Sequence, residues 1–236
     1  MSQARATLHM LSAGAAQGLA RALEPQWTAA TGAALAARYG AVGAMKEAFD
    51  RGEPCDVIVL TAAMIDAMAA AGTVRPDTRA ALGRVRTGIA VRSGDPAPEV
   101  GSPEALRAAL LAADAVYFPD PERATAGIHF AKVMRELGIA DALRERLRPF
   151  PNGATAMREL AAATSARPIG CTQHTEILYT PGVRLVAALP REFELATVYT
   201  AAVGARAADA ALARRFVDLL AGPAAQPLRA GGGFET

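Results

Sequence analysis

The stretch Thr7–Trp27 changes from the repeat of a strand to the repeat of a helix within a few residues, and this change constrains the fold most. Residues 8–11 form an apolar run typical of a buried strand. Leu19, Leu23 and Trp27 then recur at i, i+4 and i+8, the spacing of one helix face. A short turn of small residues therefore joins a strand directly to a helix.

That turn is a candidate anion site. The first backbone N–H groups of a helix have no intrahelical acceptor, and the helix dipole places partial positive charge there, so both features favour a bound anion. The same residues also fit an ordinary connection. Ser12 accordingly has two interpretations, a hydroxyl donor to a ligand or the N-cap of its own helix.

The alternation of strand and helix patterns continues along the chain. We expect further strands at 33–40, 55–60, 87–92, 115–118, 169–172, 183–189 and 195–204. The loop 40–44 is expected to lead into a helix at 45–51, and a final helix ends at Gly222-Pro223. This order predicts parallel α/β sheets covered by helices on both faces.

The pattern also predicts two Rossmann-like α/β lobes. Residues 94–98, GDPAP, give the strongest linker signal. We expect residues 1–90 with 198–236 to form a discontinuous first lobe and residues 91–197 the second, joined by two crossing hinge strands. A cleft between such lobes is a default site for a small ligand.

Composition excludes several classes of protein. With 52% apolar and 20% charged residues the chain is globular, and its charges form no basic block that would indicate nucleic acid. No apolar run approaches the roughly 18 residues of a membrane span. The sequence has no nucleotide-binding glycine fingerprint and predicts no cofactor.

The histidines and cysteines give no sign of a metal site. We expect His9 to be a core residue of the first strand and His129 to have a structural role. Cys55 and Cys171 are expected to be buried thiols, and the glycines at 231–233 are expected to form a flexible tail.

Several stretches resemble the molybdate-binding proteins of ABC transporters, which have the type II periplasmic-binding-protein fold. The matching segments are LSAGAAQGL at 11–19, FDRGEPCDVIVLTA at 49–62, FPDPERATAGIHFAKVMRELGI at 118–139, NGATAMREL at 152–160, PIGCTQHTEIL at 168–178 and the terminal GPAAQPLRAGGGFE. They occur in the order of the family and cover nearly the whole chain.

The resemblance implies a set of ligand-binding residues, because the family holds an oxyanion between hydroxyl groups and helix-start N–H groups. The implied positions are Ser12, Ala13, Gly14, Gly43, Ala44, Thr125, Ala126, Gly127, Asn152, Gly153, Gln173 and His174. The second serine loop of the family is here AVGA at 41–44, without a hydroxyl, and its tyrosine is replaced by Gln173 or His174. These losses favour a small organic carboxylate over molybdate.

Two hypotheses of function follow. The first is a solute-binding protein that closes around a small anion. The second is an enzyme on the same fold, an isomerase or lyase of a small unsaturated di- or tricarboxylic acid that resembles aconitate isomerase. In that case His174 and Glu176 are the candidate catalytic groups, because one base must act near an activated C–H bond.

The expected partners are a small anionic ligand and the membrane component of an ABC transporter, without nucleic acid or membrane insertion. We expect a monomer. The expected location is the periplasm if an export signal is removed from the amino terminus, and the cytoplasm otherwise, since MSQARAT at 1–7 has no apolar signal core.

Overall fold

The computed structural model describes residues 6–235, so most of the segment MSQARAT at 1–7, on which the expected location rests, lies outside the described residues. The described residues form two compact units, one containing the chain up to Arg84 and again from Thr197, the other spanning Val85–Ala196. Two strands, β4 (Ala80–Arg92) and β9 (Ala196–Val203), carry the chain across the boundaries. The loop at 94–98, predicted as a linker, lies within the second unit.

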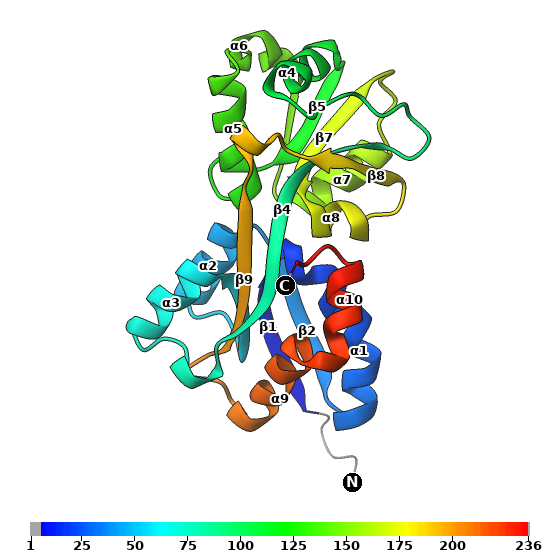
Figure 1. Ribbon diagram of the computed structural model, residues 1–236. Helices are drawn as coiled ribbons and strands as arrows, with labels where there is room; N and C mark the ends of the chain where they lie inside the picture. Colours follow the sequence, from blue (N-terminus) through cyan, green and yellow to red (C-terminus); the bar gives the residue numbers. More distant parts are fainter. Residues whose placement is uncertain (1–5, 236) are drawn as a thin grey trace. The chain divides into compact units, whose positions relative to one another are not determined.

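The first unit has a sheet in the order β2-β1-β3-β9. Its other strands are β1 (Thr7–Ala13), β2 (Ala34–Gly40) and β3 (Val57–Thr61), and its helices are the 3-10 turn η1 (Gly14–Ala16), α1 (Gln17–Thr31), α2 (Val42–Asp50), α3 (Ala62–Ala70), α9 (Ala210–Ala221) and α10 (Gln226–Gly231). The first three strands are parallel, as the alternating pattern predicts, whereas β9 pairs antiparallel with β3. Figure 1 shows α2 and α3 on one side of this sheet and α1 and α10 on the other.

The predicted apolar face of α1 is confirmed. Leu19, Leu23 and Trp27 are buried, and the Trp27 ring meets Phe216 of α9 edge to face, with 5.0 Å between ring centroids. Such aromatic pairs stabilise a core beyond their buried area. The first unit is therefore held together by side chains from both of its chain segments.

The second unit has a sheet in the order β4-β7-β5-β6, with β8 paired to β4. Its remaining strands are β5 (Ala115–Pro119), β6 (Leu147–Phe150), β7 (Pro168–Gln173) and β8 (Val183–Ala188), and its helices are α4 (Pro103–Ala112), α5 (Thr125–Glu136), α6 (Ala140–Leu143), α7 (Gly153–Ala161) and α8 (His174–Tyr179). Apolar side chains fill both faces of the sheet. Phe130 and Val133 of α5 belong to one core cluster, and Met157 of α7 and Ile177 of α8 to the other.

These observations confirm the predicted fold class, two α/β lobes joined by two crossing strands. Parallel strands that carry helices on both faces bury continuous apolar runs, which is why residues 57–60 have no exposed side chain.

Four local expectations are wrong. The helix expected at 45–51 begins at Val42, so Gly43 and Ala44 lie in its first turn rather than in a loop. The start has no side-chain cap and therefore no sequence signal.

The carboxyl-terminal glycines are not a free tail. The N–H of Gly232 donates to the Leu228 carbonyl oxygen over 2.9 Å, Phe234 is buried, and Glu235 pairs with Arg84. Burial of the Phe234 ring explains why this end is ordered.

His9 is not a core histidine, because its side chain is 42% exposed and its Nδ1 lies 3.5 Å from Asp56. Cys55 is only partly buried, whereas Cys171 is fully buried, and both thiols are free. Burial raises the pKa of the Cys55 thiol to about 12.

Candidate functional site

Three helices of the first unit begin at one edge of its sheet. The parallel strands β1, β2 and β3 end at Ala13, Gly40 and Thr61, and η1, α2 and α3 follow them within two residues. The carboxyl edge of parallel strands is where α/β folds bind ligands. The sequence-predicted residues Ser12, Ala13, Gly14, Gly43 and Ala44 all lie at this edge.

None of these three helix starts has a side-chain cap. The residues at the N-cap positions are Ala13, Ala41 and Thr61, and none of their side chains accepts a hydrogen bond from the following turn. The first N–H groups of η1 and α2 therefore have no side-chain acceptor of their own. An anion placed there would receive hydrogen bonds and the favourable end of the helix dipole.

Ser12 is fully buried near the end of β1, and its hydroxyl donates to the carbonyl oxygen of Ala13 over 2.9 Å. It does not cap a helix, so the N-cap interpretation is wrong. A hydroxyl can rotate about its C–O bond, and its oxygen retains acceptor capacity. The position of Ser12 beside the uncapped start of η1 fits a ligand contact.

The second unit repeats this arrangement with β5, β6 and β7. These strands are parallel, and α5, α7 and α8 follow them. The helix α5 has Ala124 as its N-cap and no side-chain cap, so Thr125, Ala126 and Gly127 form an open first turn. A Cβ at residue 127 would overlap the carbonyl oxygens of Pro119 and Asp120, and only glycine therefore permits this close approach.

The start of α7, in contrast, is closed by the protein itself. The Asn152 side chain accepts from the N–H of Thr155 over 2.8 Å, as expected of an N-cap. The carboxyl group of Glu176 accepts from the N–H groups of Gly153 and Ala154 and from Gln173. The Thr172 hydroxyl donates to the same carboxyl group over 2.5 Å.

Glu176 is therefore a buried carboxyl group with a complete set of donors. Burial raises its pKa above the ordinary value, and the hydrogen bonds from Thr172 and the backbone N–H groups oppose this effect only in part. The sequence around Glu176 gives no indication that its side chain meets the start of α7. The spacing of Thr172 and Glu176, four residues apart, does allow the hydrogen bond between these two side chains.

Gln173 and His174 lie at the junction of β7 and α8, both close to β4. Oriented with its nitrogen toward the backbone, the buried Gln173 amide donates to the carbonyl oxygens of Arg86 over 3.2 Å and Val85 over 3.3 Å. The His174 ring lies against Gly88, where a Cβ would be 2.5 Å from Nε2.

Thr175 is a residue of this region that the sequence-based site set omits. Its hydroxyl is buried and has no hydrogen-bond partner within residues 6–235. A buried hydroxyl without a partner costs about 1–3 kcal/mol. A ligand or a bound water that supplied the missing hydrogen bond would recover that free energy.

His129 has the structural role expected for it. It lies on α5, and its Nε2 is 2.7 Å from the carbonyl oxygen of Phe193. This contact joins α5 to the segment before β9 and leaves His129 out of the candidate site.

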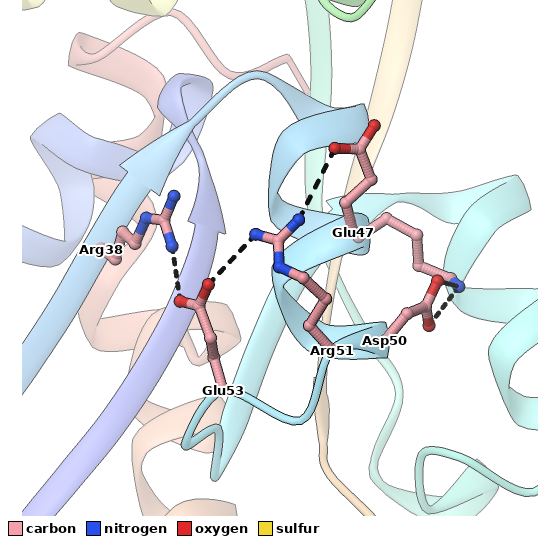
Figure 2. A network of polar contacts seen from close by, with 6 residues as sticks. Arg38, Glu47, Asp50, Arg51 and Glu53 are labelled. Atoms are coloured by element: carbon pink, nitrogen blue, oxygen red, sulfur yellow. Dashed lines mark hydrogen bonds and ion pairs between the residues drawn. The ribbon is translucent and has the colours of Figure 1, made fainter.

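The arginines of the first unit mainly serve ion pairs on its surface. Figure 2 shows Arg38 and Arg51 on the two carboxylate oxygens of Glu53, at 2.5 and 3.2 Å, with Arg51 also facing Glu47 at 3.9 Å. The hydrogen bond from Arg38 is the main cause that lowers the pKa of Glu53. Arg38 and Arg51 are therefore already paired with carboxylates of the protein itself.

Within residues 6–235 no group of three or more His, Cys, Asp or Glu side chains is arranged to hold a metal ion. Among the described helices, none combines the length and the apolar character that crossing a bilayer requires.

Comparisons with known proteins agree with this geometry. The family described as "Bacterial extracellular solute-binding protein" matches residues 8–235. A periplasmic molybdate-binding protein from Azotobacter vinelandii superposes with a TM-score of 0.78 at 18% identity, over 97% of this chain and 99% of the other. The sulfate-binding protein SubI from Mycobacterium tuberculosis H37Rv superposes with a TM-score of 0.73 at 18% identity, over 98% and 86%.

A further match is to an aconitate isomerase from a Pseudomonas species. It is 28% identical over 224 residues, which cover 91% of this chain and 82% of the isomerase.

Proposed function

Since the chain belongs to the bacterial extracellular solute-binding protein family, we propose that it binds a small organic anion that carries carboxylate groups. One observation carries this proposal. The helices η1, α2 and α5 begin without side-chain caps at the carboxyl edges of their sheets, whereas α4, α7 and α9 are each capped by a side chain. An anionic ligand would supply the acceptor that these open starts lack.

The donors at these edges suit a carboxylate better than a tetrahedral oxyanion. The segment that opens α2 contains no hydroxyl side chain, and the first N–H groups of α7 are occupied by Glu176 and Asn152. Each missing hydrogen bond to a charged group costs about 1.5–3 kcal/mol. A buried tetrahedral anion that lacks two donors would therefore bind several orders of magnitude more weakly.

Two side chains add contacts of a kind that an organic acid can use. In the first unit, Ser12 contributes a buried hydroxyl at the carboxyl edge of the sheet. In the second unit, Thr175 contributes a buried hydroxyl without a hydrogen-bond partner within residues 6–235. A hydroxyl both donates and accepts, so it can pair with a carboxylate or with a hydroxyl group of the ligand.

The proposal is tested by removing single N–H donors without altering the helices. Proline is well tolerated at the first position of a helix after an extended residue, where it removes one N–H group. Ala41 and Ala124 are both extended, so Val42→Pro and Thr125→Pro meet this condition. Calorimetric titration with citrate, cis-aconitate, trans-aconitate and malate should show wild-type binding and a loss of about 10- to 100-fold in each variant.

Ala210→Pro at the start of α9 is the matched control, because Asp209 is extended and already caps that helix. This variant should keep the wild-type affinity. Equal losses in all three variants, or no binding of any of these acids by the wild type, would contradict the proposal. Molybdate, tungstate and sulfate complete the panel, and a preference for one of them would exclude the carboxylate assignment.

In this role the protein would act outside the cytoplasm and deliver its ligand to the membrane component of an ABC transporter. The family match supports both parts of this proposal.

The match to aconitate isomerase favours a second candidate function, the cofactor-free isomerisation of a small unsaturated acid. Such a reaction needs a group that moves a proton and N–H donors for the developing negative charge. His174, at the start of α8, is the candidate for the proton transfer. Glu176 is buried under its own donors, which makes it the less accessible of the two predicted groups.

This second function is tested with cis- and trans-aconitate, whose interconversion is followed by proton NMR. Turnover that falls at least 100-fold in His174→Ala while binding persists would support it. Absence of turnover in the wild type would exclude it and leave the binding function unaffected. Glu159→Gln serves as a control, because Glu159 is exposed on α7.

A further inference from the structure

Glu176 lies where an exogenous anion would be expected. Its carboxyl group receives the N–H groups of Gly153 and Ala154, which are the first two of α7, together with the N–H of Gln173 and the hydroxyl of Thr172. The carboxyl group lies against Gly153 at the start of α7 and accepts from the Thr172 hydroxyl, so a side chain of the protein itself occupies this position.

The surrounding residues fit this occupant closely. A Cβ at residue 153 would overlap Glu176 Oε2 and Thr172 Oγ1, so the carboxyl group fills the space above Gly153. The Asn152 side chain satisfies the next N–H of the helix, that of Thr155. No donor of the first turn of α7 is left for a ligand.

This closure distinguishes α7 from α5 within the same unit. Both helices follow strands of one parallel set, β5 and β6, so their starts lie at the same sheet edge. The start of α5 is open and the start of α7 is filled. At this edge of the second unit's sheet, the start of α7 is therefore not available to an anionic group of a ligand, whereas the start of α5 is.

We propose that Glu176 is an internal substitute for a bound anion at the start of α7 and that it determines ligand class by excluding tetrahedral inorganic oxyanions. This inference deepens the proposed function and rests on it for the identity of the accepted ligands. Glu176 acts here as a specificity-determining residue. The ligand it admits is an organic acid, one anionic group of which is held by the open start of α5 in the same unit.

Chemical rescue tests the inference directly. Glu176→Ala empties the space and exposes the N–H groups of Gly153 and Ala154, so small carboxylates should bind there. Formate at 100 mM should raise the melting temperature of this variant by about 3 °C more than that of the wild type. Sulfate and molybdate should bind the variant at least tenfold more tightly than the wild type.

Ile177→Ala is the matched control, because Ile177 is equally buried on α8 but lines an apolar cluster. Its cavity lacks N–H donors, so formate should not raise its melting temperature. Equal responses of the two variants to formate would overturn the inference. Tight molybdate binding by the wild type would also overturn it.

A double-mutant cycle covers the case in which Glu176→Ala folds poorly. Gly153→Ala should lower the melting temperature of the wild type, because the new methyl group collides with the Glu176 carboxyl group. In the Glu176→Ala background the same methyl group enters vacated space and should cost less or nothing. Additive effects would contradict direct occupation of the site. The double-mutant cycle compares melting temperatures in the absence of ligand. Its outcome therefore does not depend on whether the wild type binds organic carboxylates.

Discussion

Glu176 combines two opposing effects on one side chain. Burial disfavours its charged form, while the Thr172 hydroxyl and the backbone N–H groups of Ala154, Gln173 and Gly153 favour it, and the balance raises its pKa above 4.5. In the folded protein the proton is therefore held more tightly than in the unfolded chain. This difference couples stability to pH.

The sign of the coupling follows from which state holds the proton. Below pH 4.5 both states are protonated, and the contribution of Glu176 to stability is complete. As pH rises from there through the higher folded-state pKa, only the unfolded chain loses its proton at first. The free energy of unfolding should then fall, by at most about 1.4 kcal/mol per pH unit.

Glu176→Gln keeps the shape and removes the titration, so its melting temperature should depend less on pH over this window. Calorimetric melts of the wild type and the variant between pH 4 and 8 measure the difference. Glu159→Gln, at an exposed position of α7, should give a plot of melting temperature against pH that is parallel to that of the wild type. Parallel curves for Glu176→Gln as well would show that Glu176 does not titrate with the folding equilibrium.

At the scale of single elements, the sequence predicts what depends on local periodicity. Phe130, Val133 and Met134 recur at i, i+3 and i+4, the spacing of one helix face, and all three side chains are buried on α5. Ser102 followed by Pro103 has the form of a helix start, and the Ser102 hydroxyl accepts from the N–H of Ala105 over 3.2 Å at the start of α4. These signals lie within a few residues of each other, so they can be recognised without the fold.

The start of α2 was missed for the opposite reason. A helix that begins without a capping side chain has no start signal, and its N-cap Ala41 resembles any loop residue. The absence of a cap, which supports the anion-binding proposal at η1, α2 and α5, thus also hides the start of α2 from sequence analysis. The contact of Glu176 with Gly153 was missed because it joins residues of two different helices.

The antiparallel pairing of β9 has a similar explanation. Its apolar run predicted a strand, and the strand is observed as Ala196–Val203. The direction in which a strand pairs depends on where the chain re-enters the sheet. The chain returns to the sheet of the first unit through β9 only after the whole second unit. No local sequence pattern therefore indicates the direction in which β9 pairs.

At the scale of the whole molecule, the two units differ in how the chain builds them. The second unit is one continuous segment, and both of its core clusters, which extend from Ile89 to Leu189, lie within it. The first unit is made from two segments, because β9 and α9 come from the chain after Thr197. Continuity of chain and core is the property expected of an independently folding domain.

We therefore expect a fragment of residues 85–196 to fold alone and a fragment of residues 6–84 to remain unfolded. The shorter fragment lacks β9, which pairs with β3, and Phe216, which packs against Trp27. Circular dichroism should show a cooperative thermal transition only for residues 85–196. Trp27 is the single tryptophan of the chain, so its fluorescence reports on the other fragment without interference.

In residues 6–84 the emission of Trp27 should be that of a solvent-exposed indole, whereas in the full chain its side chain is only 2% exposed. The full chain is the control, and its emission should shift to the exposed position only on unfolding. A cooperative transition of residues 6–84 with buried emission would show that β1, β2 and β3 form a core without the returning segment. Absence of a transition in residues 85–196 would show instead that the second unit depends on the first, despite its continuous core.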